Sequence, residues 1–142
     1  MKHKLNCILV IDDDEATNFF TRMMLEESGC TEHIKIAESG AEALEYLTKS
    51  EVEKDNSGHY PVPNLIFLDI NMPAMNGWEF LEEYKAINTT DKTIVVMLTT
   101  SLFPEDELKA ANLPQISGFE HKPLTAKKLE AILEKYLLSV FV

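Results

Sequence analysis

The chain has 142 residues and a mass of 16.1 kDa, and 45% of its residues are hydrophobic, which is enough for one domain with its own core. Its 24 acidic and 13 basic residues give a net charge of -11, which argues against nucleic acid or a membrane surface as a direct partner. No apolar run has the length of a signal peptide or a membrane span, and Cys7 and Cys30 lack metal-ligand spacing. We therefore expect a cytoplasmic protein with reduced cysteines.

Strand and helix patterns begin near the start of the chain. The apolar run Ile8–Ile11 predicts a strand, and Asp12 and Asp13 follow it directly. Asp14 is placed to cap a helix over 15–28, and Gly29 is placed to end it. Apolar residues recur at helical spacing within that helix: Ala16, Phe19, Phe20 and Met23.

The next strand and helix precede a polar stretch. His33–Ala37 alternates as a short strand, and Ser39-Gly40-Ala41-Glu42 is typical of a capping box before a helix over 40–49. The polar stretch Ser50–Pro63 predicts a long surface loop, in which we expect His59 and Tyr60 to face solvent. No second domain is expected in this stretch.

Two further strand and helix pairs follow the loop. Leu65–Asp69 is apolar up to its last residue, which is typical of a strand covered on both faces, and Gly77 opens a helix. Thr93–Leu98 predicts another buried strand. A helix then begins at Pro104 and stops before Pro114.

The last predicted elements are a short strand near Ser117–Glu120 and a helix that Thr125 caps, followed by the apolar tail Leu137–Val142. Five alternating strands and helices predict a doubly wound α/β fold, in which helices cover both faces of a five-stranded parallel sheet. Right-handed crossovers bring the residues that follow the strands to the edge where such folds bind ligands: Asp12, Asp13, Asp69, Thr99 and Lys122.

These side chains favour phosphoryl transfer assisted by a divalent ion. Three carboxylates within about 5 Å of one another repel by roughly 3 kcal/mol per pair at an effective dielectric near 20, so a cation must hold them. Mg²⁺ suits an open site of carboxylate oxygens. Asp69 stands alone at its strand end and is the best-placed nucleophile, while Lys122 and Thr99 can donate to phosphoryl oxygens.

Four segments carry a resemblance to a known family: Ile8-Leu9-Val10-Ile11-Asp12-Asp13-Asp14, Leu68-Asp69-Ile70-Asn71-Met72-Pro73-Ala74-Met75-Asn76-Gly77, Met97-Leu98-Thr99-Thr100-Ser101 and Lys122-Pro123. Together they resemble the receiver domains of bacterial two-component response regulators, in the stand-alone chemotaxis-type form. The resemblance covers nearly the whole chain and implies a flavodoxin-like fold with strand order 2-1-3-4-5. It also implies one domain over 1–142, with a core of about 5–138 and no output domain.

The resemblance further implies roles for the residues at the sheet edge. Asp69 would be the phosphoacceptor, and Asp13, Asp69 and the backbone carbonyl of Asn71 would ligate Mg²⁺, for which Mn²⁺ can substitute. Asp12 would help mainly through a metal-bound water. Lys122 would contact the phosphoryl group, and the Lys122-Pro123 bond would be cis.

Switching and lifetime involve residues beside this set. Thr99 would be the switch hydroxyl, and Phe119 falls where the family has an aromatic residue that changes rotamer. Asn71 and Ser101 match positions that tune attack of water on the aspartyl-phosphate, and neither is an acid. We therefore expect Mg²⁺-dependent self-phosphorylation from small phosphodonors and slow self-dephosphorylation in a signalling protein that is not an enzyme.

The expected phosphodonor is a sensor histidine kinase or a histidine phosphotransfer protein, and the output passes to a downstream protein. The expected contact face, also available for a homodimer, comprises the helix from Pro104, the strand with Phe119 and the helix from Thr125. An apolar patch can add to it, formed by Leu108, Leu113, Leu124 and the tail Val140-Phe141-Val142, unless that tail packs on the core.

Two alternatives from other classes remain. A pseudo-receiver that binds partners without phosphorylation would be favoured if Asp69, Asp13, Thr99 or Lys122 were missing, and all four are present. A metal-dependent phosphatase working through an aspartyl intermediate would need a second acid two residues after the nucleophile, where this chain has Asn71.

Overall fold

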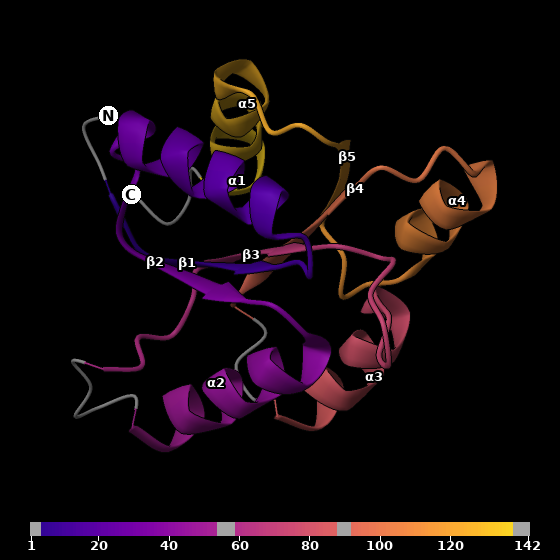
Figure 1. The fold of residues 1–142 in the computed structure, drawn as a ribbon, viewed down its shortest axis with the longest axis horizontal. Coiled ribbons are helices and arrows are strands. Elements are labelled where there is room, and N and C mark those ends of the chain that lie inside the picture. The colour runs from indigo at the N-terminus through magenta and orange to yellow at the C-terminus, as the bar shows by residue number, and fades with distance from the viewer. Residues whose placement is uncertain (1–3, 54–58, 88–91, 138–142) are drawn as a thin grey trace.

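The computed structural model describes residues 4–53, 59–87 and 92–137, which form one five-stranded sheet with five helices (Figure 1). All strand pairs are parallel, and the strand order is β2-β1-β3-β4-β5, which confirms the predicted fold class and order. In chain order the elements are β1 Leu5–Ile11, α1 Glu15–Ser28, β2 Thr31–Ala37, α2 Gly40–Glu53, β3 Leu65–Leu68, α3 Gly77–Ile87, β4 Ile94–Thr99, α4 Pro104–Asn112, β5 Gly118–His121 and α5 Ala126–Leu137.

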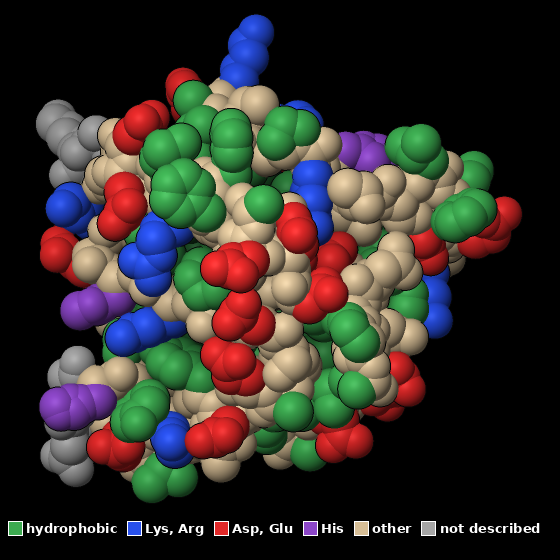
Figure 2. Space-filling view, in the orientation of Figure 1, with side chains coloured by type: hydrophobic (Ala, Val, Ile, Leu, Met, Phe, Trp, Pro, Cys, Tyr) green, Lys and Arg blue, Asp and Glu red, His purple; other side chains and the backbone are tan. Residues whose placement is uncertain are grey.

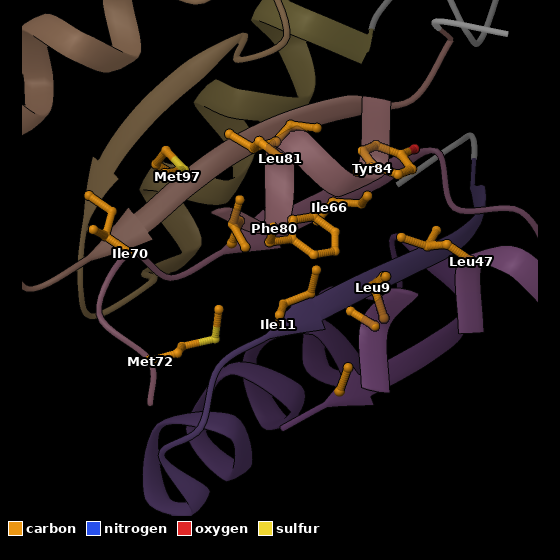
Figure 3. Close-up of a cluster of buried hydrophobic side chains, with 14 of the residues drawn as sticks. Leu9, Ile11, Leu47, Ile66, Ile70, Met72, Phe80, Leu81, Tyr84 and Met97 are labelled. Atoms are coloured by element: carbon orange, nitrogen blue, oxygen red, sulfur yellow. The ribbon is translucent and has the colours of Figure 1, made fainter. Parts of the chain in front are cut away.

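The helices form a layer on each side of the sheet. Helices α1 and α5 cover one face, and α2, α3 and α4 lie on the other (Figure 1). Alternation along β1 sends Ile8 and Val10 into the core under α1 and α5, and sends Leu9 and Ile11 into the core under α2 and α3. Figure 3 shows this second core, in which the ring of Phe80 lies close to Leu9 and Ile11. The strands β1, β3 and β4 are buried between these two cores, which fixes the position of their carboxyl ends. The polar residues predicted from the sequence lie at that edge of the sheet.

The stretch between α2 and β3 differs from the predicted surface loop. Helix α2 continues to Glu53, four residues beyond its predicted end, so Ser50 is helical and buried. Tyr60, expected in solvent, is half-buried, and its ring meets that of Tyr46 with centroids 5.8 Å apart. The hydroxyl of Tyr46 donates to the Pro61 carbonyl at 2.6 Å, which anchors the end of the stretch. The polar composition of Ser50–Pro63 gave no indication of these contacts.

Helix α1 has the predicted bounds and caps but turns its aromatic residues outward. The Asp14 carboxylate accepts from the Thr17 N–H, and Gly29 ends the helix with φ 63°. Phe19 and Phe20 are 68% and 54% exposed. The buried positions are instead Asn18, Thr21 and Leu25. Figure 2 shows hydrophobic side chains gathered over the part of the surface where α1 lies.

Two smaller expectations have clear outcomes. Thr125 caps α5 by accepting from the Lys128 N–H, as predicted, and the buried stripe of α5 includes Leu129, Ile132 and Leu133. Leu124 is buried in the core under α1 and α5, so its predicted place in a surface patch is wrong. Most of the apolar tail, residues 138–142, lies outside the described residues.

Within the part of the chain that the structure describes, no helix combines the length and the apolar character needed to cross a membrane.

Candidate phosphorylation site

The carboxyl edge of the sheet brings three acidic side chains together. Asp12 and Asp13 follow β1, and Asp69 follows β3, which is the neighbour of β1 in the sheet. Each carboxylate offers an oxygen, and these oxygens all lie within 4.8 Å of one another. Asp12 and Asp69 are only 3% and 6% exposed, whereas Asp13 is open to solvent. The cluster predicted from the strand ends therefore exists, with one side open to a ligand.

Lys122 contacts two of these carboxylates from the end of β5. Its Nζ lies 2.5 Å from Asp12 Oδ2 and 3.5 Å from Asp69 Oδ2. Its backbone N–H donates to the Thr99 carbonyl, and the Lys122-Pro123 bond is cis, as the resemblance implied. The ammonium thus sits against the acidic cluster, but it balances only one of three negative charges.

Backbone groups hold two of the carboxylates in place. Asp12 Oδ1 accepts from the Asp14 N–H at 2.9 Å, and Asp69 Oδ1 accepts from the Ile70 N–H at 2.9 Å. Burial raises the pKa of the Asp69 carboxyl and Asp12 adds to the rise, while Lys122 and the Ile70 N–H act against it. A cation bound here would favour the ionised form of Asp69.

The connection from β3 to α3 places the backbone close behind Asp69. A Cβ on Gly77 would lie 2.6 Å from the Asp69 carbonyl oxygen, so only glycine fits without a shift. Ala74 has φ 67°, and the Pro73 carbonyl accepts from the Met75 N–H at 2.7 Å around it, a strained γ-turn. Asn71, two residues after Asp69, is exposed.

Reciprocal bonds between Asn76 and Glu79 cap α3. The Glu79 N–H donates to Asn76 Oδ1 at 2.9 Å, and the Asn76 N–H donates to Glu79 Oε1 at 3.0 Å. Sequence reasoning missed this cap, although the spacing Asn-x-x-Glu signals it. The cap fixes the start of the helix that follows the acidic site.

Thr99 is completely buried at the end of β4, beside β3 in the sheet. Its Oγ1 accepts from the Ser101 N–H at 3.1 Å. The hydroxyl of Ser101 in turn donates to Asp106 Oδ2 in α4 at 2.5 Å. Phe119 is half-buried and packs against the core under α2, α3 and α4. Thr99 is therefore linked through Ser101 to the first turn of α4.

Taken together, the parallel α/β fold and the acidic cluster at the carboxyl edge of the sheet define a flavodoxin-like protein with a candidate metal site at that edge. The family model of the response regulator receiver domain matches residues 8–134, and the chain belongs to this family. Receiver domains of two-component response regulators are signalling domains that receive phosphoryl groups from histidine kinases or phosphotransfer proteins.

Solved structures and a curated relative agree with this assignment. A two-component response regulator from Cytophaga hutchinsonii is 33% identical, with a TM-score of 0.83 over 95% of this chain and 98% of that one. The chemotaxis protein CheY4 of Vibrio cholerae is 26% identical, with a TM-score of 0.71 over 94% and 99%. The response regulator Rcp1 of Synechocystis is 33% identical over 106 residues, which are 75% of this chain and 69% of that protein.

Proposed function

We propose that Asp69 is the phosphoacceptor of this receiver domain, which takes a phosphoryl group from a sensor histidine kinase or a histidine phosphotransfer protein. The observation that carries the proposal is the contact of one ammonium, that of Lys122, with the buried Asp69 carboxylate inside a cluster of three carboxylates. Such a pair presents a nucleophilic oxygen beside a positive charge for the oxygens of the incoming group.

Mg²⁺ fits the residues present, and Mn²⁺ is expected to replace it. Three carboxylates against one ammonium leave two negative charges in excess, and all the donors are the hard oxygens that Mg²⁺ prefers. In our proposal Asp13, Asp69 and the backbone carbonyl of Asn71 hold the ion, and Asp12 acts through a bound water. When bound, the ion supplies positive charge that neutralises the transferring oxygens.

The protein side chains then carry the transfer. An Asp69 carboxylate oxygen bonds to phosphorus as the bond from phosphorus to the donor's imidazole nitrogen breaks, and that nitrogen keeps the electron pair. Lys122 donates to the transferred group, because its Nζ already lies 3.5 Å from Asp69 Oδ2. Asp12 keeps the ammonium oriented through its contact at 2.5 Å.

Switching follows from a change of partner at Thr99. Its Oγ1 now accepts from the Ser101 N–H, and in the phosphorylated state it donates to a phosphoryl oxygen. When Thr99 releases the Ser101 N–H, the segment between β4 and α4 moves. The half-buried ring of Phe119, which lies beside α4, changes its position with that segment. A contact that exists only after phosphorylation shifts the population of the two arrangements.

Slow loss of the phosphoryl group is part of the proposal. Neither Asn71 nor Ser101 supplies a carboxylate base for an attacking water, and the Ser101 hydroxyl is engaged by Asp106. The protein is thus a long-lived signal carrier, which phosphorylates itself from small donors but has no separate substrate.

The proposed output surface is the face of α4, β5 and α5. Leu102, Phe103 and Leu108 are exposed large hydrophobic residues at its α4 end. A groove of about 360 Å³ on this face is lined by residues of all three elements, among them Ala110, Phe119 and Tyr136. We propose this surface as the binding site for the downstream protein or for a second copy of the chain. We also propose a cytoplasmic location for the regulator.

The test is incubation with acetyl phosphate, with and without Mg²⁺, followed by intact mass. A gain of one phosphoryl group is expected only with Mg²⁺, and Asp69→Asn abolishes it. No gain in the wild-type protein, with Mg²⁺ binding demonstrated by calorimetry, would instead support a pseudo-receiver that binds its partners without phosphorylation. The decay of the phosphorylated mass over time measures self-dephosphorylation.

A further inference from the structure

Asn18 is a buried polar residue beside the acidic site that the proposed transfer does not use. It lies in the first turn of α1 with its side chain toward the sheet, and it is only 6% exposed. The helical spacing of the apolar residues in α1 gave no reason to predict a role for Asn18. Its burial therefore needs an explanation from its contacts.

One end of the Asn18 amide is bonded to the loop that carries the metal ligands. Nδ2 donates to the backbone carbonyl of Asp12 at 2.8 Å, in a buried hydrogen bond between residues six positions apart. The opposite assignment of the amide would set its oxygen against the Asp12 carbonyl oxygen, so this bond fixes the orientation. Asn18 thereby ties α1 to the end of β1.

The other end of the amide finds no hydrogen-bond partner among the described residues. Asn18 Oδ1 is a buried side-chain atom for which the described residues provide no hydrogen bond. A leucine of similar volume would fill the same space beside the core without an unpaired oxygen. Packing alone therefore does not explain asparagine at this position, whereas the bond to Asp12 does.

We propose that Asn18 is a positioning residue for the metal site, an inference that rests on the proposed Mg²⁺ role. The Asp12 carbonyl is the backbone group between the side chains of Asp12 and Asp13. The Asp12 carboxylate is also held by the Asp14 N–H and Lys122. Asp13 is exposed, so the direction of the backbone decides where the Asp13 carboxylate lies. By holding that carbonyl, Asn18 keeps both carboxylates preorganised for one ion.

The test is calorimetric titration of Mg²⁺ into the full chain, with four proteins compared: wild type, Asn18→Leu, Asn18→Asp and Thr21→Val. Thr21 is the matched control, because it is buried on the same face of α1 one turn later. We expect the Mg²⁺ dissociation constant to rise five-fold or more in Asn18→Leu and to stay within two-fold in Thr21→Val. Asn18→Leu also leaves the buried Asp12 carbonyl without its donor, so urea unfolding without Mg²⁺ measures the stability lost with this bond and shows that the variant is folded under the titration conditions.

Asn18→Asp separates positioning from charge. It adds a negative charge near the cluster, which by attraction alone would tighten Mg²⁺ binding, but it replaces the donor to Asp12 with an acceptor. Positioning predicts weaker binding. In acetyl phosphate assays both variants should need more Mg²⁺ for half-maximal rate and approach the wild-type rate at saturation.

The outcomes distinguish this inference from the proposed function. If the wild type binds no Mg²⁺, the proposed metal role fails and this inference fails with it. If the wild type binds Mg²⁺ and both Asn18 variants bind it equally well, or Asn18→Asp binds it more tightly, only the positioning role is overturned. Asn18→Asp is close to isosteric, so circular dichroism that matches the wild type keeps the test valid even if Asn18→Leu does not fold.

Discussion

Helices α3 and α4 both follow strands that end at the candidate phosphorylation site, yet they are attached in different ways. Helix α3, after the strand of Asp69, buries four residues in the core: Gly77, Phe80, Leu81 and Tyr84. Helix α4, after the strand of Thr99, buries only Ala110. The start of α3 has a reciprocal cap, whereas the N-cap of α4, Phe103, makes no side-chain capping bond.

Polar contacts replace the missing apolar burial at α4. Ser101 donates to Asp106 in its first turn, and Lys109 lies 4.7 Å from the ring centre of Trp78 in α3. Such contacts stabilise weakly and exchange partners at low cost, whereas moving α3 would open the core. The difference indicates that α3 holds Asp69, the proposed phosphoacceptor, fixed, whereas α4 is the helix that can move at lower cost.

Truncating Phe80, one of the core residues of α3, should have the largest effect and tests this comparison most strongly. Phe80 is fully buried and its ring stacks on Tyr84, with centroids 5.6 Å apart. We expect Phe80→Ala to lower the free energy of unfolding by about 3–5 kcal/mol through lost burial and a cavity. Leu108→Ala in α4, where the side chain is 64% exposed, should change it by less than about 0.5 kcal/mol. Urea denaturation measures both, and similar losses would refute the contrast.

The start of α3 offers a second test that reaches the site itself. In Gly77→Ala the new Cβ meets the Asp69 carbonyl oxygen, a backbone atom that cannot turn aside. We expect a loss of about 1–3 kcal/mol and a slower reaction with acetyl phosphate, because Asp69 must shift. In the control Gly118→Ala the contact is with the Tyr136 side chain, which can move, so the loss should be smaller. An unchanged phosphorylation rate in Gly77→Ala would mean that α3 does not hold Asp69.

Sequence was informative where a candidate site residue directly follows an apolar run. Asp69 was predicted this way, because the buried parallel strand β3 is a continuous apolar segment whose carboxyl end lies at the shared edge. Lys122 follows β5, which is half-buried and contains polar residues, so its prediction rested on the alternation of strands and helices and on the Lys122-Pro123 pair. The same local logic identified the caps Asp14 and Thr125. Each of these features depends on residues within one turn or one strand.

Features that depend on the packing of separate elements were not predictable. Apolar spacing in α1 predicted the helix but not which side faces the sheet, and Phe19 and Phe20 point outward. The bond from Asn18 to Asp12 forms only once α1 lies on β1. The bond between Ser101 and Asp106 likewise requires the turn between β4 and α4. No periodic pattern in the sequence predicts these contacts.

Removal of the Asp106 carboxylate tests the first polar contact of α4. Asp106→Ala leaves the buried Ser101 hydroxyl without its acceptor, so we expect a loss of about 1–2 kcal/mol. Hydrogen exchange should become faster at the start of α4 and stay unchanged in α3. Glu105→Ala, an exposed acid of the same turn, is the control for the helix dipole. Equal effects of the two variants would assign the role to charge at the helix end rather than to Ser101.

The contact of Lys109 with the half-buried Trp78 should have the smallest effect, because an exposed ammonium over an aromatic ring contributes about 0.5–1 kcal/mol. A double-mutant cycle of Lys109→Met and Trp78→Leu measures it, since the coupling excludes what each residue contributes alone. If α4 shifts on phosphorylation, the coupling energy should fall in protein treated with acetyl phosphate and Mg²⁺. A coupling that stays the same in both states would mean that α4 keeps its place against α3, and the response would then have to lie in β5 and α5.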